Sequence, residues 1–312
     1  MAKKTSLDPS RKKKLPAYRS FRLSRTIKPD AIHVIPPLKQ LWTDTWNFLW
    51  LHRRKMLKFV AVYTLTYLVL VKGLTGFSLD TAELKTELQE AFGGSFGSIT
   101  TFTLLYASLL SSLSGSSSEI TNYFMVTITV VFSLAFIWLV RKLHLRNSTS
   151  TVKDAFYQGM RPLIPFLVVI GIMLMQLIPV AIGGLVYLSI QSTVLAVSDL
   201  EVISITVLAI LGLVLSVYLL AGSVFAIYIV TLPNTTPMVA LRSSMRLLRI
   251  HRWVVLRRML LFFVALIVLG FVLVLPFIIW FPALAEYAFF IMGCASFAVM
   301  HTFMYKLYRS ML

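Results

Sequence analysis

T-P-M-V-A-L-R-S-S-M-R-L-L-R-I-H-R-W-V-V-L-R-R, residues 236–258, has the pattern of a basic amphipathic helix that leads into a membrane span. Thr236 is a suitable N-cap, and Pro237 takes the first helical position, where its missing N–H costs little. Apolar and basic side chains then recur on neighbouring faces at the helical spacing i, i+4, i+7. The apolar face carries Leu241, Met245 and Leu248, and the basic face carries Arg242, Arg246 and Arg249.

The composition is that of a membrane protein. The chain has 312 residues, of which 58% are hydrophobic and 13% are charged, whereas soluble domains carry about 25% charged residues. Runs without a charged residue are close to, or longer than, the roughly 20 residues that a helical span needs. These runs cover residues 162–198, 202–241, 259–285 and 287–305. The sequence therefore predicts an all-α, polytopic helical membrane bundle.

The net charge of +18 indicates membrane topology through its placement. Residues 1–35 are polar and basic without helical periodicity, and we expect a disordered cytoplasmic tail that contacts anionic lipid. An RNA-binding arm is the alternative for the tail, although we expect no nucleic-acid partner. The single cysteine, Cys294, excludes a disulfide framework or a cysteine zinc cluster within one chain.

Residues 36–312 are predicted to form one membrane domain with six spans. The spans are expected at about 59–78, 122–140, 163–189, 202–231, 259–281 and 287–305. Between the first two lies an extracytoplasmic segment, residues 79–121, in which the short, Ser/Thr-rich piece 99–113 stays outside or is re-entrant. Lys72 falls in the outer half of the first span, and we expect its side chain to extend toward the interface.

The distribution of charge sets the orientation. With both termini in the cytoplasm, 28 of the 30 Lys and Arg residues lie on the cytoplasmic side. If residues 99–113 crossed the bilayer, every later loop would invert and thirteen basic residues would face outward, against the positive-inside rule. We therefore predict a protein of the cytoplasmic membrane, with five arginines contacting anionic headgroups on its cytoplasmic face. These are Arg161, Arg242, Arg246, Arg249 and Arg252. A loop helix that packs on its own bundle, with its charges solvated, is the alternative for residues 236–258.

A unit of one interfacial amphipathic helix and one transmembrane hairpin is predicted to occur three times. D-A-F-Y-Q-G-M-R at 154–161 aligns with V-A-L-R-S-S-M-R at 239–246, and a shift of 199 places His52-Arg53 on His251-Arg252. The surface helices are then expected at 38–55, 151–161 and 236–258. The returning spans end in similar sequences, S-L-A-F at 133–136, V-F-A-I at 224–227 and S-F-A-V at 296–299.

The segments D-A-F-Y-Q-G-M-R-P-L-I-P-F and T-P-M-V-A-L-R-S-S-M-R-L-L-R-I-H-R-W resemble those of bacterial six-span inner-membrane proteins. These are the membrane domain associated with glycerophosphoryl diester phosphodiesterases and the YciC-like proteins of unknown function. The resemblance implies a multi-pass inner-membrane protein. It transfers no catalytic residue, because His52-Arg53 and His251-Arg252 lack the glycine and carboxylate pattern of such phosphodiesterases.

No catalytic constellation is recognisable, and we expect neither an enzyme nor a bound cofactor or metal. His301 lies where the repeat places Trp138 and Ile229, and no acid falls within the predicted spans, so a packing role is expected for it. Gln176 is expected to form an interhelical hydrogen bond, and small residues at Gly183, Gly184, Gly212 and Ser216 permit close helix packing.

These patterns favour a non-catalytic scaffold or envelope-homeostasis protein whose basic cytoplasmic collar binds anionic lipid. The alternative is a transporter or flippase of an amphiphilic or anionic small molecule that uses the basic ring as its mouth. A membrane enzyme ranks last.

Overall fold

The computed structural model describes residues 36–73, 119–145, 150–192, 199–249 and 251–312, and every regular secondary-structure element in these ranges is a helix. The helices are α1 (Leu38–Leu51), α2 (Arg53–Tyr67), the π-helical turn η2 (Leu68–Lys72), α6 (Glu119–His144), α7 (Val152–Gly159), α8 (Leu163–Met175), α9 (Ile178–Ser192), α10 (Asp199–Ser223), α11 (Ala226–Val230), α12 (Pro237–Leu248), α13 (Arg252–Trp280) and α14 (Pro282–Arg309). The predicted tail 1–35, the segment 99–113 and the end of the predicted first span lie outside the described residues.

Five helical segments in the described part of the chain are long and apolar enough to cross a membrane. They are Ile120–His144, Leu163–Tyr187, Val202–Val230, Arg252–Phe277 and Leu284–Arg309. They coincide with the last five predicted spans, and the prediction of a multi-pass helical membrane protein is confirmed. The helix formed by α2 and η2 lies at the first predicted span. It is not among the five, because several basic residues in its first turns leave too short an apolar stretch within the described residues.

Three short helices lie at the positions expected for the surface helices, and their N-termini follow the sequence signals. Thr151 forms a capping box with Asp154, and the Thr236 hydroxyl accepts a hydrogen bond from the Val239 N–H. The segment 236–258, however, is not one continuous helix. The chain turns at His251, with φ −113° and ψ 15°, and at His52, which the predicted repeat aligns with it, with φ −106° and ψ 21°. These turns redirect the chain from each surface helix into the long helix that follows.

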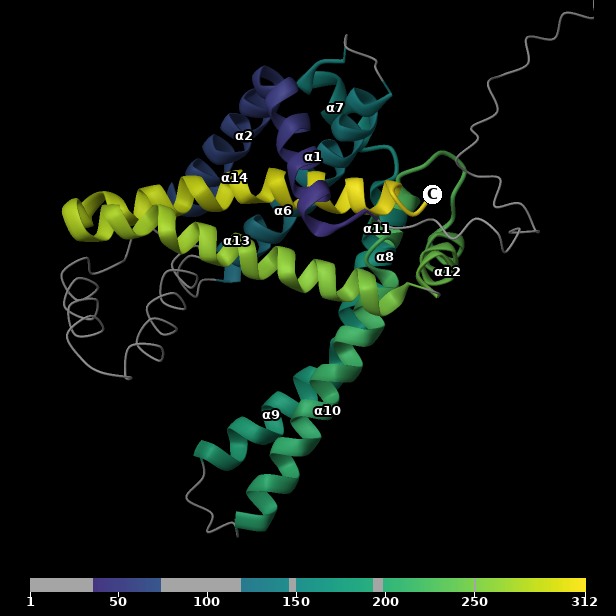
Figure 1. Ribbon diagram of the computed structural model, residues 1–312, viewed down its shortest axis with the longest axis vertical. Coiled ribbons are helices and arrows are strands. Elements are labelled where there is room, and N and C mark those ends of the chain that lie inside the picture. Colours follow the sequence, from purple (N-terminus) through teal and green to yellow (C-terminus); the bar gives the residue numbers. More distant parts are fainter. Residues whose placement is uncertain (1–35, 74–118, 146–149, 193–198, 250) are drawn as a thin grey trace, which may run out of the picture.

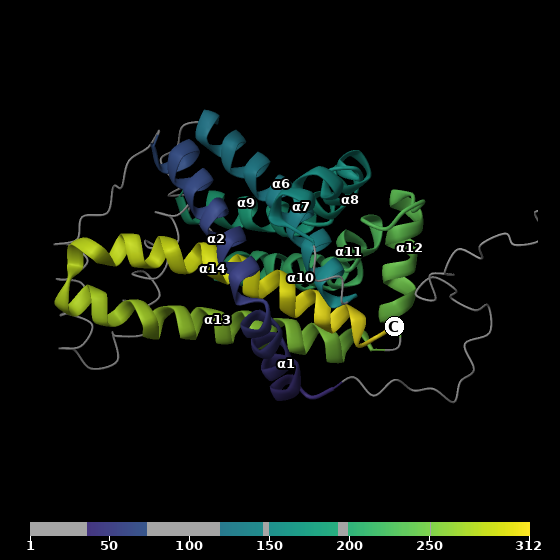
Figure 2. The same ribbon diagram turned by 90° about the horizontal axis from the view of Figure 1, so that it is seen from above.

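Each short helix packs on a helix of another hairpin. Helix α7 lies on α6, where a Cβ added to Gly159 would meet the Ala135 Cα at 3.0 Å. Helix α12 lies on α10 and α11, and the Ser244 hydroxyl donates to the Gly222 carbonyl oxygen at 2.7 Å. Helix α1 lies on the last helix, α14. The short helices thereby join the hairpins to one another, as Figures 1 and 2 show.

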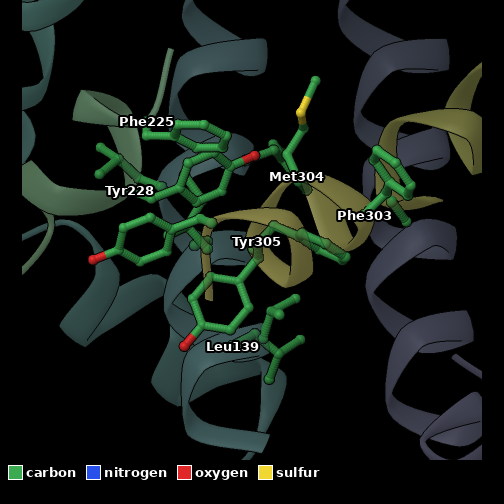
Figure 3. Close-up of a cluster of buried hydrophobic side chains, with 14 of the residues drawn as sticks. Leu139, Phe225, Tyr228, Phe303, Met304 and Tyr305 are labelled. Atoms are coloured by element: carbon green, nitrogen blue, oxygen red, sulfur yellow. The ribbon is translucent and has the colours of Figure 1, made fainter. Parts of the chain in front are cut away.

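The buried core draws on most of the described helices, and α6, α11 and α14 meet within it. Figure 3 shows part of it, a cluster that includes Leu139, Phe225, Tyr228, Phe303, Met304 and Tyr305. At this junction His301 of α14 hydrogen-bonds with the Ser133 hydroxyl of α6 through Nε2 at 3.1 Å and with the Tyr228 hydroxyl of α11 through Nδ1 at 3.2 Å. Arg141 of α6 also donates to the carbonyl oxygens of Tyr228 and Thr231 at the end of α11. These bonds connect the three hairpins.

The α9–α10 hairpin extends away from the α13–α14 hairpin in Figure 1. Its two helices approach closely at glycines, since a Cβ on Gly212 would lie 2.7 Å from the Pro179 carbonyl oxygen. The helix is interrupted between α8 and α9, just before Pro179. This is expected, because the ring of a proline clashes with the preceding helical turn. Gln176, at the break, donates to the Ser223 hydroxyl at 2.8 Å, so the predicted interhelical hydrogen bond is confirmed.

The prediction that Lys72 extends to the interface is wrong. Its side chain is 1% exposed, and Nζ lies 3.5 Å from Oε1 of Glu286 on α14. Helix α14 begins at Pro282, earlier than the predicted start at residue 287, so Glu286, which was predicted to lie in a turn, falls within the last candidate membrane helix. In an apolar surrounding, pairing with an opposite charge stabilises an ammonium group that is otherwise costly to bury.

Candidate anion-binding site

Four of the five arginines predicted to contact lipid line one hollow of about 530 Å³, here called the arginine pocket. Its lining residues are Tyr218, Arg242, Met245, Arg246, Arg249, Arg252, Trp253 and Val254. Arg242 and Arg246 lie on α12, Arg249 is its C-cap, and Arg252 begins α13. The fifth, Arg161, follows α7, is exposed and does not line this pocket.

Helix α12 presents the arginines because its opposite face is buried. Ala240, Leu241, Ser244 and Leu248 pack inward, and this fixes the rotation of the helix. Arginines spaced at i, i+4 and i+7 therefore all lie on its exposed side. The turn at His251 then brings Arg252 against the same hollow. The sequence predicted this face correctly, except that Met245 is 44% exposed at the pocket instead of packing with Leu241 and Leu248.

Helix α10 forms the far side of the pocket and positions Arg252. The Arg252 guanidinium carbon lies 4.3 Å from the ring centroid of Tyr218, within the range of a cation–π contact. A Cβ on Gly222 would lie 3.3 Å from the Arg252 Nη2 atom, so this glycine leaves room for the guanidinium group. Neither Tyr218 nor Gly222 was identified from the sequence, because nothing local to α10 indicates that α13 begins beside it.

The pocket is strongly electropositive. None of its eight lining residues is acidic. Within the described chain, the one salt bridge joins Lys72 to Glu286 and leaves Arg242, Arg246, Arg249 and Arg252 without a carboxylate partner. Like charges this close repel one another, and an anion bound among them relieves the repulsion. Planar guanidinium groups match the oxygens of phosphate or carboxylate in bidentate hydrogen bonds.

An apolar rim accompanies the charges. Trp253 is 69% exposed and Met245 is 44% exposed, and both line the pocket. Tryptophan is enriched at the membrane–water interface, where its ring is partly apolar and partly polar. Trp253 belongs to the first turn of a candidate membrane helix, so the four arginines lie at the end of that helix.

A metal cluster and a titrating histidine would be two other kinds of site within the described residues. Across the described ranges, no three His, Cys, Asp or Glu side chains come together as metal ligands. His301 is buried among aromatic rings and bonded on both ring nitrogens to hydroxyl groups. This agrees with the predicted packing role.

No protein-family model matches the chain, and neither a curated protein nor a solved structure matches it.

Proposed function

We propose that this protein is a non-catalytic scaffold or envelope-homeostasis protein of the cytoplasmic membrane that binds anionic lipid headgroups on its cytoplasmic face. The observation that carries this proposal is the arginine pocket. Four arginines and an exposed tryptophan line it, and none of its lining residues is acidic. Basic residues near an anionic leaflet contribute about 1 kcal/mol each. Exposed Arg161, at the end of the neighbouring surface helix, extends the same basic collar.

The proposed topology has six spans, with the α2–η2 helix as the first and both termini in the cytoplasm. Three repeats of a surface helix and a hairpin account for the order of the helices. Supporting observations are the matching turns at His52 and His251, and the alanines of the three similar span ends. Ala135, Ala226 and Ala298 are all buried. The motifs at 154–166 and 236–253 support membership of the six-span family that they resemble.

Lipid retention tests the proposed function. We expect the triple variant Arg242→Gln/Arg246→Gln/Arg249→Gln to lose about a hundredfold in preference for anionic over neutral lipid, because each direct hydrogen bond from these arginines to the bound headgroup contributes about 1 kcal/mol. The measurement is the amount of phosphatidylglycerol that the purified protein retains. The matched control, Arg54→Gln/Arg257→Gln/Arg309→Gln, removes three exposed arginines that do not line the pocket and should retain the lipid. Equal losses in both variants would contradict a specific site.

Cysteine labelling tests the topology. In a Cys294→Ser background, single cysteines at Glu119 and Asp199 should react with an impermeant reagent added from outside the cell. Cysteines at Arg242 and Arg309 should react only after the membrane is opened. Labelling of Arg242 from outside would overturn the orientation.

Transport of an anionic amphiphile is the second candidate function, and the buried Lys72–Glu286 pair favours it. Ionisable residues inside membrane helices frequently mark a transport path, and π-helical turns such as η2 are frequent at functional sites. The test is movement of a labelled anionic lipid between the leaflets of liposomes that contain the protein. If the protein is a transporter, the labelled lipid should change leaflets faster than in liposomes without protein, and Glu286→Gln should abolish this increase. If it is a scaffold, the rate should equal that of liposomes without protein.

A further inference from the structure

We propose that the arginine pocket selects a lipid headgroup that carries two phosphate groups, which deepens the proposed function and rests on it. The inference begins from the number of charges. Four guanidinium groups line a single hollow without an acidic neighbour in its lining. A phosphodiester with one negative charge compensates one of them and leaves the others repelling one another.

The spacing of the arginines divides them into two pairs. Arg242 and Arg246 are one helical turn apart on α12, so both can reach one phosphate. Arg249 and Arg252 lie on either side of the turn that joins α12 to α13. The seven residue steps from Arg242 to Arg249 correspond to about 10 Å along a helix axis, so the two pairs leave the backbone at different heights and a second phosphate gives the second pair a partner of its own.

Arg252 is held in position for the second phosphate. Its guanidinium group packs on the Tyr218 ring and beside Gly222 of α10, so its orientation does not have to be fixed when the ligand binds. A pre-oriented guanidinium loses less conformational entropy per hydrogen bond. The hollow of about 530 Å³ lies within the range of small-molecule sites and accommodates a headgroup larger than a single phosphate.

The surroundings of the pocket indicate a lipid as the source of the phosphates. Two turns along α13 from Trp253, seven residues later, Leu260 is exposed. Two turns along α10 from Tyr218, seven residues earlier, Leu211 is exposed. These leucines are 50% and 60% exposed and lie within candidate membrane spans. Two apolar faces therefore run from the pocket along helices that contact each other, and acyl chains attached to the bound headgroup can follow them.

The test compares lipids at equal charge. The full-length protein is placed in nanodiscs of neutral lipid, and a labelled diphosphatidylglycerol is displaced by unlabelled diphosphatidylglycerol or by phosphatidylglycerol that supplies the same total negative charge. We expect diphosphatidylglycerol to bind about thirtyfold more tightly, since the second phosphate engages two further arginines. Arg249→Gln/Arg252→Gln should lose this preference but still bind phosphatidylglycerol through Arg242 and Arg246. The matched control Arg54→Gln/Arg257→Gln should keep it, and both variants are checked for unchanged unfolding in neutral detergent.

The outcomes separate the two proposals. Equal affinity for the two charge-matched lipids overturns the two-phosphate inference and leaves the anionic-lipid site intact, whereas no binding of either lipid overturns both. Inorganic diphosphate is the probe for a soluble ligand. We expect it to displace the labelled lipid only at concentrations far above those of the lipid, and displacement at equal concentration would overturn the assignment to a lipid.

Discussion

Removing one charge of the buried Lys72–Glu286 pair should destabilise the protein strongly. In Glu286→Leu, the Lys72 ammonium group stays in a site where its side chain is 1% exposed, and it loses an acceptor 3.5 Å away. Breaking a buried ion pair by removing one partner costs about 3–5 kcal/mol, because the remaining buried charge loses the attraction of its opposite charge. We expect a loss of this size in the free energy of unfolding, measured by thermal and denaturant unfolding in neutral detergent.

The double variant Lys72→Met/Glu286→Leu supplies the matched comparison. It removes both charges and keeps apolar volume, so its stability should lie within about 1 kcal/mol of the original protein or above it. The two single substitutions should then be non-additive by about 3 kcal/mol or more. If Glu286→Leu costs less than about 1 kcal/mol, or if the double variant is as unstable as the two single losses combined, the Lys72–Glu286 pair does not stabilise the protein.

Three further predictions concern packing, the central hydrogen bonds and acid stability. Gly212→Ala should cost about 1–3 kcal/mol, because the new Cβ lies too close to the Pro179 carbonyl oxygen, whereas the control Gly184→Ala meets no atom within 4 Å and should be neutral or slightly stabilising in the same unfolding assay. His301→Leu should cost about 1–3 kcal/mol by leaving two buried hydroxyl groups unbonded, and equal stability would show that His301 only fills space. Hydrogen bonds from Thr151 lower the pKa of the Asp154 carboxyl in the folded protein. The stability that Asp154 contributes to α7 is therefore present above the unfolded pKa of about 4 and is lost as the pH falls through the lower folded pKa. Amide hydrogen exchange in α7 should become faster below about pH 4, and Asp154→Asn should remove this pH dependence.

Features set by nearby residues were predictable from the sequence. The N-caps at Thr151 and Thr236 depend on residues within three positions, and the arginine face of α12 depends on a helical period. The five long apolar helices follow from composition alone. The close packing of α9 on α10 was also predictable, because glycines at helical spacing on two consecutive helices have few other uses in a membrane.

Features set by distant residues were not predictable. Lys72 and Glu286 are 214 residues apart, and the sequence of neither helix indicates that the two will face each other. The same holds for His301 and Ser133, which are 168 residues apart. In the arginine pocket, the four arginines were found from their spacing, but the wall that orients Arg252 comes from α10 and depends on how the hairpins meet.

The proposed repeat relates the arginine face of α12 to the corresponding faces of the other two short helices. By the alignment of the three copies, the positions of Arg242, Arg246 and Arg249 carry Thr43, Asn47 and Trp50 in the first copy, and Tyr157, Arg161 and Ile164 in the second. The buried positions of the surface helix change far less in character, since Leu41, Ala155 and Ala240 all pack inward. Packing therefore constrains the buried faces of α1, α7 and α12 but not their exposed faces, and the exposed face of α12 is basic. If the arginines served only to orient the chain in the membrane, their position on the helix would not matter, and they would have no reason to share one face that opens toward a wall on α10. Their convergence favours a bound anion over topology as the reason for the third copy's charge.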